Sequence, residues 1–203
     1  MSEDNSSSTS SPSSKPLVFD LLMLIGTTAF EVAGLIIWFE FDARGMSGVG
    51  LIILFIGLVL ERLVISGIPR QLDDWLPILG SSWWEYAAWA LWFTLIQSKG
   101  LPPIGVFALV LFPGLHFQHA FSISLKGDRT FSQLVRHSGF ILFALIESVG
   151  GVLWLAALNS SAGNTIPAHL IIIVAVTIEH IVQGIVLNAI NQEGRLRQMG
   201  DAH

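Results

Sequence analysis

One stretch organises this sequence, Glu147-Ser148-Val149-Gly150-Gly151-Val152-Leu153-Trp154, in which a glutamate in an apolar run is followed seven residues later by a tryptophan. The same spacing occurs twice earlier, in Glu31–Trp38 and in Glu85–Trp92. Seven residues are nearly two turns of an α-helix, so each glutamate lies on about the same helix face as its tryptophan. We therefore expect three apolar helices that each carry one glutamate.

A second apolar run follows each of these segments and also carries a polar pair near its middle. The pairs are Glu61-Arg62, Gln118-His119 and Glu179-His180, and they follow the three glutamates by 30, 33 and 32 residues. A recurrence at a nearly constant period indicates an internal repeat. The sequence thus predicts three antiparallel helical hairpins around a pseudo-threefold axis, which would place a shared site on that axis.

The composition is that of a membrane protein. The chain is 52% hydrophobic and 12% charged, whereas a soluble domain carries about 25% charged residues. Apolar segments of roughly 20 residues recur from Leu17 onward, long enough to cross a hydrocarbon core of ~30 Å. We predict an all-α integral membrane protein whose six transmembrane helices cover residues 17–41, 49–66, 81–96, 104–125, 138–158 and 168–190.

The six helices form one predicted domain, residues 17–191, between two polar tails. Residues 1–16 are rich in serine and lack the basic start and cleavage site of a signal peptide, so we expect a disordered tail. Residues 192–203 form a polar tail at the other end. One side of the membrane receives seven basic residues and the other receives two, Arg44 and Lys99. This bias predicts that both termini are cytoplasmic.

The composition also excludes several classes of protein. There are no cysteines, which rules out disulfides, thiolate metal sites and iron–sulfur clusters. The net charge is −5 and the sequence has no basic patch, so nothing indicates a nucleic-acid partner. The expected surroundings are a lipid bilayer, and the sequence leaves the oligomeric state open.

On the predicted topology, every helix contributes a polar position to one layer in the cytoplasmic half of the membrane. Ionisable groups at such depths are costly and usually functional. We take eight residues as candidate metal ligands: Glu31, Glu61, Glu85, His116, His119, Glu147, Glu179 and His180. We expect five more side chains to surround them: Arg62, Gln118, Trp38, Trp92 and Trp154. The tryptophans have packing as their more common role, and shielding of the site as a second role.

Charge favours a dinuclear centre. Five ionised glutamates carry −5 and Arg62 carries +1, and two divalent cations would neutralise the remaining −4. Carboxylate and imidazole ligands from facing helices build the di-iron and di-manganese sites of helical bundles. We therefore expect two divalent transition-metal ions, iron or manganese in preference to zinc. Alternatively, several of the glutamates are protonated and only hold neighbouring helices together through hydrogen bonds.

A metal site at this depth meets apolar molecules directly, so oxidative chemistry on a lipid or other apolar substrate is the favoured function. The first alternative is a transporter or channel for a metal cation or for protons that uses the same carboxylates. The second is a haem protein with His119 and His180 as axial ligands, which would leave the five glutamates without a role.

Overall fold

The computed structural model describes residues 17–100, 102–124, 130–160 and 165–200, and within them every regular element is helical. The elements in chain order are α1 (Leu17–Ala43), α2 (Ser47–Ser66), η1 (Leu72–Asp74), α3 (Trp75–Lys99), α4 (Pro103–Val106), η2 (Phe107–Leu111), α5 (Phe112–Ser124), α6 (Phe131–Val135), α7 (Ser138–Ser160) and α8 (Ile166–Gly200). The predicted tail of residues 1–16 lies outside the described residues.

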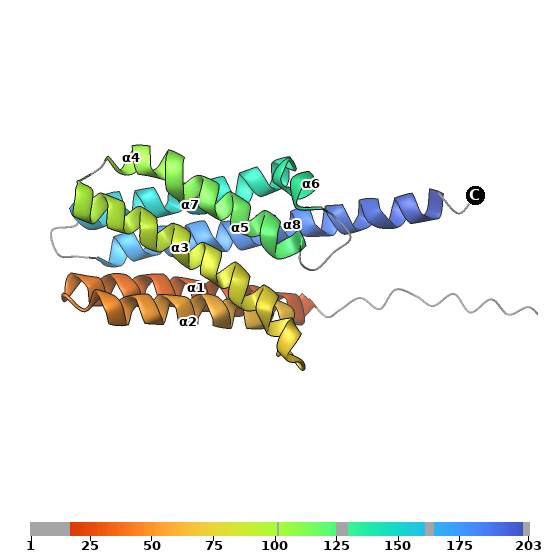
Figure 1. Cartoon of the computed structure of the whole chain (residues 1–203), viewed down its shortest axis with the longest axis horizontal. Coiled ribbons are helices and arrows are strands. Elements are labelled where there is room, and N and C mark those ends of the chain that lie inside the picture. The colour runs from red at the N-terminus through yellow and green to blue at the C-terminus, as the bar shows by residue number, and fades with distance from the viewer. Residues whose placement is uncertain (1–16, 101, 125–129, 161–164, 201–203) are drawn as a thin grey trace, which may run out of the picture.

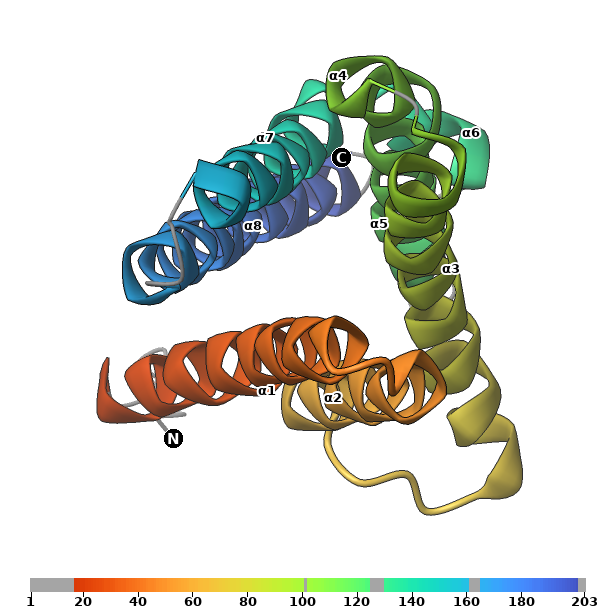
Figure 2. The ribbon, with the colours of Figure 1, turned by 90° about the vertical axis from the view of Figure 1, so that its left-hand side faces the viewer.

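The long helices form three pairs that run side by side (Figure 1). Helix α1 packs against α2, α3 against α5, and α7 against α8. Contacts of α2 with α3, of α5 with α7, and of α8 with α1 join the pairs into a ring. Seen along the bundle, the three pairs lie roughly as the sides of a triangle (Figure 2). We call the end where α1 begins the terminal end, and the end with the α1–α2 turn the turn end.

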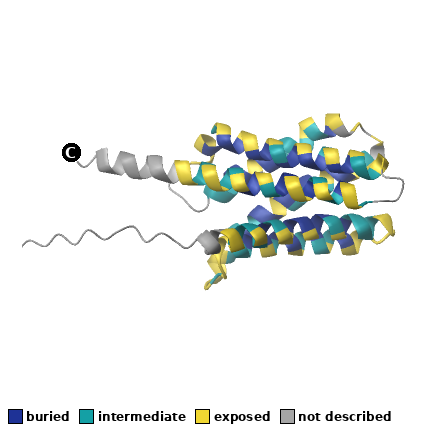
Figure 3. Ribbon diagram, turned by 180° about the vertical axis from the view of Figure 1, so that it is seen from behind, coloured by how far each residue is buried: buried dark blue, intermediate teal, exposed yellow. Residues whose placement is uncertain are grey.

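Five helical segments in the described part of the chain are long and apolar enough to cross a membrane: Leu21–Ala43, Ser47–Ser66, Ile104–Ser124, Ser138–Ser160 and Ile166–Ala189. Large apolar side chains of the helices are exposed, whereas five glutamates, three histidines and Arg62 are buried. Figure 3 shows how buried and exposed positions are distributed along the helices. This distribution fits a multi-pass integral membrane protein, because the bilayer solvates apolar surface and penalises charge. Helix α3 is not among the five. It carries five of the seven tryptophans, whose amphipathic rings lower its mean hydropathy.

Two helices differ from the sequence prediction at their starts and ends. Helix α3 begins at Trp75 rather than at residue 81, and Pro77 lies in its first turn, where a backbone N–H has no intrahelical partner. Helix α8 continues to Gly200, through much of the predicted polar tail. The segment between the predicted helices 104–125 and 138–158 contains the short helix α6, which starts with a capping box between Thr130 and Gln133.

The predicted fourth helix is divided into α4, η2 and α5. Segment η2 is π-helical, and at its end the Phe112 N–H bonds to the Phe107 carbonyl five residues back. Pro113 follows directly and has no N–H to donate, so the regular hydrogen-bond ladder is interrupted at this point. A proline inside a helix interrupts it, and here the interruption is accommodated as a π-turn just before the helix that carries His119.

Each helix pair has a close contact between small residues. A Cβ added to Gly57 of α2 would lie 3.0 Å from Gly34 Cα of α1. Likewise, a Cβ on Gly114 would lie 2.7 Å from Ala88 Cβ, and one on Gly150 would lie 2.2 Å from Ala175 Cβ. Gly34, Ala88 and Gly150 each stand three residues after one of the repeated glutamates. Small residues let two backbones approach closely, so these contacts bring each pair together at the depth of its polar residues.

Candidate metal centre

Five carboxylates converge inside the bundle, one each from α1, α2, α3, α7 and α8. They belong to Glu31, Glu61, Glu85, Glu147 and Glu179, and none of these residues is more than 2% exposed. Burying a carboxylate is costly unless a cation or hydrogen-bond donors compensate its charge. The surroundings of each carboxylate therefore decide what the cluster can hold.

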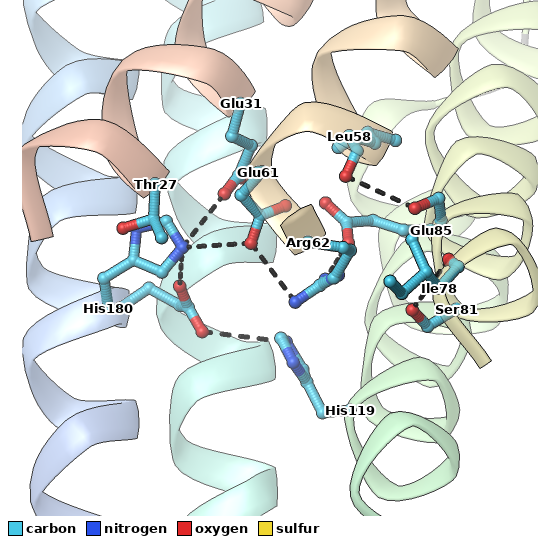
Figure 4. A network of polar contacts seen from close by, with 12 residues as sticks. Thr27, Glu31, Leu58, Glu61, Arg62, Ile78, Ser81, Glu85, His119 and His180 are labelled. Carbon is cyan, nitrogen blue, oxygen red and sulfur yellow. Dashed lines mark hydrogen bonds and ion pairs between the residues drawn. The ribbon is translucent and has the colours of Figure 1, made fainter. Parts of the chain in front are cut away.

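Glu179 lies at the middle of the cluster, between two histidines. Its Oε2 is 3.6 Å from His180 Nε2, and its Oε1 is 3.9 Å from His119 Nε2. Figure 4 labels both histidines. The two oxygens of one carboxylate thus face two imidazoles, one on the same helix and one on α5. This is the geometry of a carboxylate that can bridge two metal ions.

The first potential ligand group consists of Glu31, Glu179 and His180, whose ligand atoms all lie within 4.8 Å of one another. His180 Nε2 is 3.3 Å from Glu31 Oε2 and 3.4 Å from Glu61 Oε1, so Glu61 adjoins the same group. His180 Nδ1 lies 3.1 Å from the Thr28 hydroxyl. A hydrogen bond on the second ring nitrogen orients the imidazole, as is usual for metal-binding histidines.

The second group consists of His119, Glu147 and Glu179, again within 4.8 Å of one another. His119 Nε2 is 3.2 Å from Glu147 Oε2. The other oxygen of Glu147 accepts a hydrogen bond from the indole N–H of Trp89, at 3.1 Å. A Cβ at Gly151 would lie 2.6 Å from the Trp89 ring, so the absence of a side chain there leaves room for the indole.

Glu85 belongs to a third group of carboxylates, with Glu31 and Glu147, but its surroundings differ. Arg62 donates a hydrogen bond from Nη2 to Glu85 Oε2, and its Nη1 lies 3.2 Å from Glu61 Oε1 (Figure 4). A guanidinium bound directly to Glu85 already neutralises that carboxylate and repels a second cation beside it. Glu85 and Arg62 are therefore a buried ion pair at the edge of the cluster.

Seven of the eight predicted ligands are thus close together, and His116 is apart from them. Its Nε2 lies 2.9 Å from the carbonyl oxygen of Val135 in α6, and it belongs to none of the three ligand groups found among the described residues. Gln118 is completely buried, and its amide makes no hydrogen bond to any residue that the structure describes.

The three tryptophans of the repeat pack in the turn-end half of the bundle. The Trp38 ring contacts Phe93 edge-on with centroids 4.9 Å apart, and Trp154 contacts Phe39 at 5.5 Å. Trp92 contacts Trp89 at 5.7 Å. Sequence reasoning did not select Trp89, the tryptophan that bonds a glutamate. The glycines Gly150 and Gly151, which follow Glu147, could have indicated that a large side chain such as that of Trp89 approaches α7 here, because glycines mark the close approach of another group.

Chemically, the cluster offers oxygen and imidazole donors without thiolates. Comparisons with protein-family models, curated proteins and solved structures found no match to this chain. Its chemistry is therefore inferred from its own residues. The position of Glu179 disfavours the haem alternative. Its carboxylate lies between His119 and His180, in the space that a porphyrin would have to occupy.

Proposed function

We propose that this protein is an intramembrane metalloprotein with a dinuclear carboxylate–histidine centre. The observation that carries the proposal is the position of Glu179, with one oxygen toward His119 and the other toward His180. On this proposal Glu179 bridges two ions. Glu31 and His180 complete one ligand set, with Glu61 beside it, and Glu147 and His119 complete the other.

Charge balance supports this ligand set. The Glu85–Arg62 pair is neutral by itself, which leaves four glutamates with a total charge of −4. Two divalent ions neutralise them, so that the cluster as a whole carries no net charge in the membrane. Four carboxylates with two histidines match the donor set of the di-iron and di-manganese sites in helical bundles, and zinc remains the alternative.

We further propose that the ring of helices is a pseudo-threefold array of hairpins, with α3 as a sixth span. Two observations support it. The carboxylates of Glu31, Glu85 and Glu147 lie within 4.8 Å of one another, although they come from three different pairs. The close contacts of small residues recur at corresponding positions in all three pairs.

The turn-end half of the bundle favours a metal centre that stays in place over a path along which ions cross the membrane. Buried rings of Trp38, Trp89, Trp92 and Trp154 fill that half, whereas a path for ions would need polar groups or water there. A centre that stays in place, at the depth of lipid chains, suits an enzyme that acts on an apolar molecule. Oxidation of such a substrate is our working hypothesis for the reaction. An external two-electron oxidant would accept the electrons that the substrate loses.

The first prediction is the metal content of protein purified in detergent. We expect about two transition-metal ions per chain in the wild type, by analogy with dinuclear bundle sites. Glu179→Gln should lower the content to about one or less, because an amide cannot bridge two cations as a carboxylate does. The measurement is elemental analysis after removal of loosely bound metal, with circular dichroism to show that the variant is folded.

Glu40→Gln is the matched control, since Glu40 is a half-buried glutamate near the turn end that pairs with Arg44 outside the cluster. It should bind as much metal as the wild type. Folded wild-type protein without metal would refute the proposal. Metal that exchanges freely and crosses vesicle membranes would point to the transporter instead.

A further inference from the structure

The seam between α1 and α8 contains two adjoining cavities beside the proposed centre. The first has a volume of about 320 Å³, and His180 forms part of its wall. Thr27 and Gln183 supply polar groups there, and Gly184 and Leu187 of α8 extend it toward the terminal end. One proposed metal ligand is therefore reached from the side of the bundle, through the face that the bilayer surrounds.

The second cavity is an open groove of about 590 Å³ that runs along α1 toward the turn end. Its wall is mostly apolar, with Ile173 and Thr177 on the α8 side. Leu24 belongs to both cavities, so they adjoin. Thr28 lines the groove and its hydroxyl contacts His180 Nδ1. The apolar groove and the polar opening thus meet at the same histidine.

We propose that this α1–α8 seam binds a single-chain amphiphile of the fatty-acid type. The hydrocarbon chain lies in the groove, and the small polar head lies in the opening near Gln183. This order of polarity matches a lipid in the leaflet on the terminal side, whose head is at the membrane surface and whose chain points inward. The volumes are within the range of ligand pockets, and one groove accommodates one chain.

A second groove on the same protein shows what a lipid-facing surface without such a site looks like. It lies between α7 and α8, has a similar volume of about 640 Å³, and is lined by apolar residues and Gly150. None of its lining residues is a member of the proposed centre. Hydrocarbon chains of bulk lipid can fill it, whereas the α1–α8 seam adds polar groups and access to His180.

Binding in the seam does not depend on metal, but its role as the substrate site rests on the function proposed above. The test uses the full-length protein in phosphatidylcholine vesicles with a palmitic acid that carries a photoreactive diazirine in mid-chain. After illumination, labelled peptides are mapped by mass spectrometry. We expect labelling on the α1–α8 seam that excess unlabelled palmitate suppresses severalfold, and labelling of the α7–α8 groove that palmitate does not suppress.

Gly184→Leu blocks the site in this test. A Cβ at Gly184 meets no described atom within 4 Å, so the larger side chain projects into the opening without displacing the bundle. It should lower seam labelling severalfold. Gly48→Leu is the control, because Gly48 also has open space around it but lies near the start of α2, at the turn end. It should leave the labelling unchanged.

Equal labelling of both grooves without competition would overturn the inference, since it would mean bulk lipid only. The inference would also be overturned if Gly48→Leu lowered seam labelling as much as Gly184→Leu does. Metal analysis of the same samples separates the two proposals. Selective seam labelling of metal-free protein would refute the dinuclear centre and keep the binding site. Metal-loaded protein without selective labelling would refute the binding site and keep the dinuclear centre.

Discussion

At the scale of single residues, Arg62 places a buried positive charge beside two of the five glutamates. Its guanidinium bonds Glu85 and lies 3.2 Å from Glu61. In the proposed repeat, Arg62 stands at the position that His119 and His180 have in the other two helix pairs. A permanent cation therefore replaces a potential ligand in one of the three pairs. On the function proposed above, this asymmetry accounts for two metal ions rather than three, because Arg62 already supplies one positive charge.

Two neighbouring glutamates should consequently respond differently to the same substitution. Glu85→Gln should retain about two metal ions per chain, because the glutamine oxygen still accepts a hydrogen bond from Arg62 and no proposed bridging or terminal ligand is lost. Glu147→Gln should lose metal, because it removes a ligand of the group that contains His119. Elemental analysis of both variants, purified in parallel, measures the difference.

Equal losses of metal in the two variants would show that Glu85 is a ligand. The third group, Glu31 with Glu85 and Glu147, would then be the occupied one. Retention of metal in both variants would place the ions outside this cluster.

At the scale of helices, small residues set how closely each pair packs. Gly57 of α2 stands one turn before Glu61, and a Cβ there would lie 2.8 Å from the Phe30 carbonyl oxygen. The added methyl group can be accommodated only if α2 moves away from α1. The position of Glu61 in the cluster therefore depends on a residue that has no polar side chain.

We predict that Gly57→Ala lowers the stability of the protein by about 1–3 kcal/mol, the usual effect of overpacking. Gly48→Ala in the same helix is the matched control, because a Cβ there meets no described atom within 4 Å. It should be neutral or stabilise by up to about 1 kcal/mol, since alanine favours helix over glycine. Thermal unfolding in detergent compares the two, and equal stability would contradict the packing argument.

At the scale of the whole molecule, the buried glutamates and histidines lie nearer the terminal end, beside a small apolar cluster that includes Phe140 and Phe143, and buried tryptophans fill the turn-end half. The described chain begins and ends at the terminal end, and the turns near Gly45 and Gly100 lie at the other end (Figure 1). Both glycines have positive φ, 75° and 60°, a conformation that favours glycine. The orientation of the molecule in its membrane therefore decides from which side the centre and the seam are reached.

We predict that the terminal end faces the cytoplasm, from the seven-to-two bias of basic residues. A reporter fused after His203 should be active on the cytoplasmic side. A tag inserted between Asn159 and Pro167 should be reached by reagents added outside the cell. The reverse pattern of accessibility would turn the seam and the centre to the external leaflet.

Local pattern in the sequence was enough for the all-helical class and for most of the residues that gather in the cluster. Long apolar runs specify helices of membrane length, because every backbone group must bond within its own segment in a bilayer. The positions of Glu31, Glu85 and Glu147 on the predicted topology placed them in one layer, and their carboxylates do lie close together.

Only the tertiary structure decided how these side chains combine. That Glu179 faces two histidines, that Arg62 bonds Glu85, and that His116 bonds Val135 depends on the rotation and separation of different helices. Those quantities are set by contacts between residues distant in sequence, such as Gly34 with Gly57. Periodicity within one helix fixes which face a residue occupies, but not which face of another helix lies opposite.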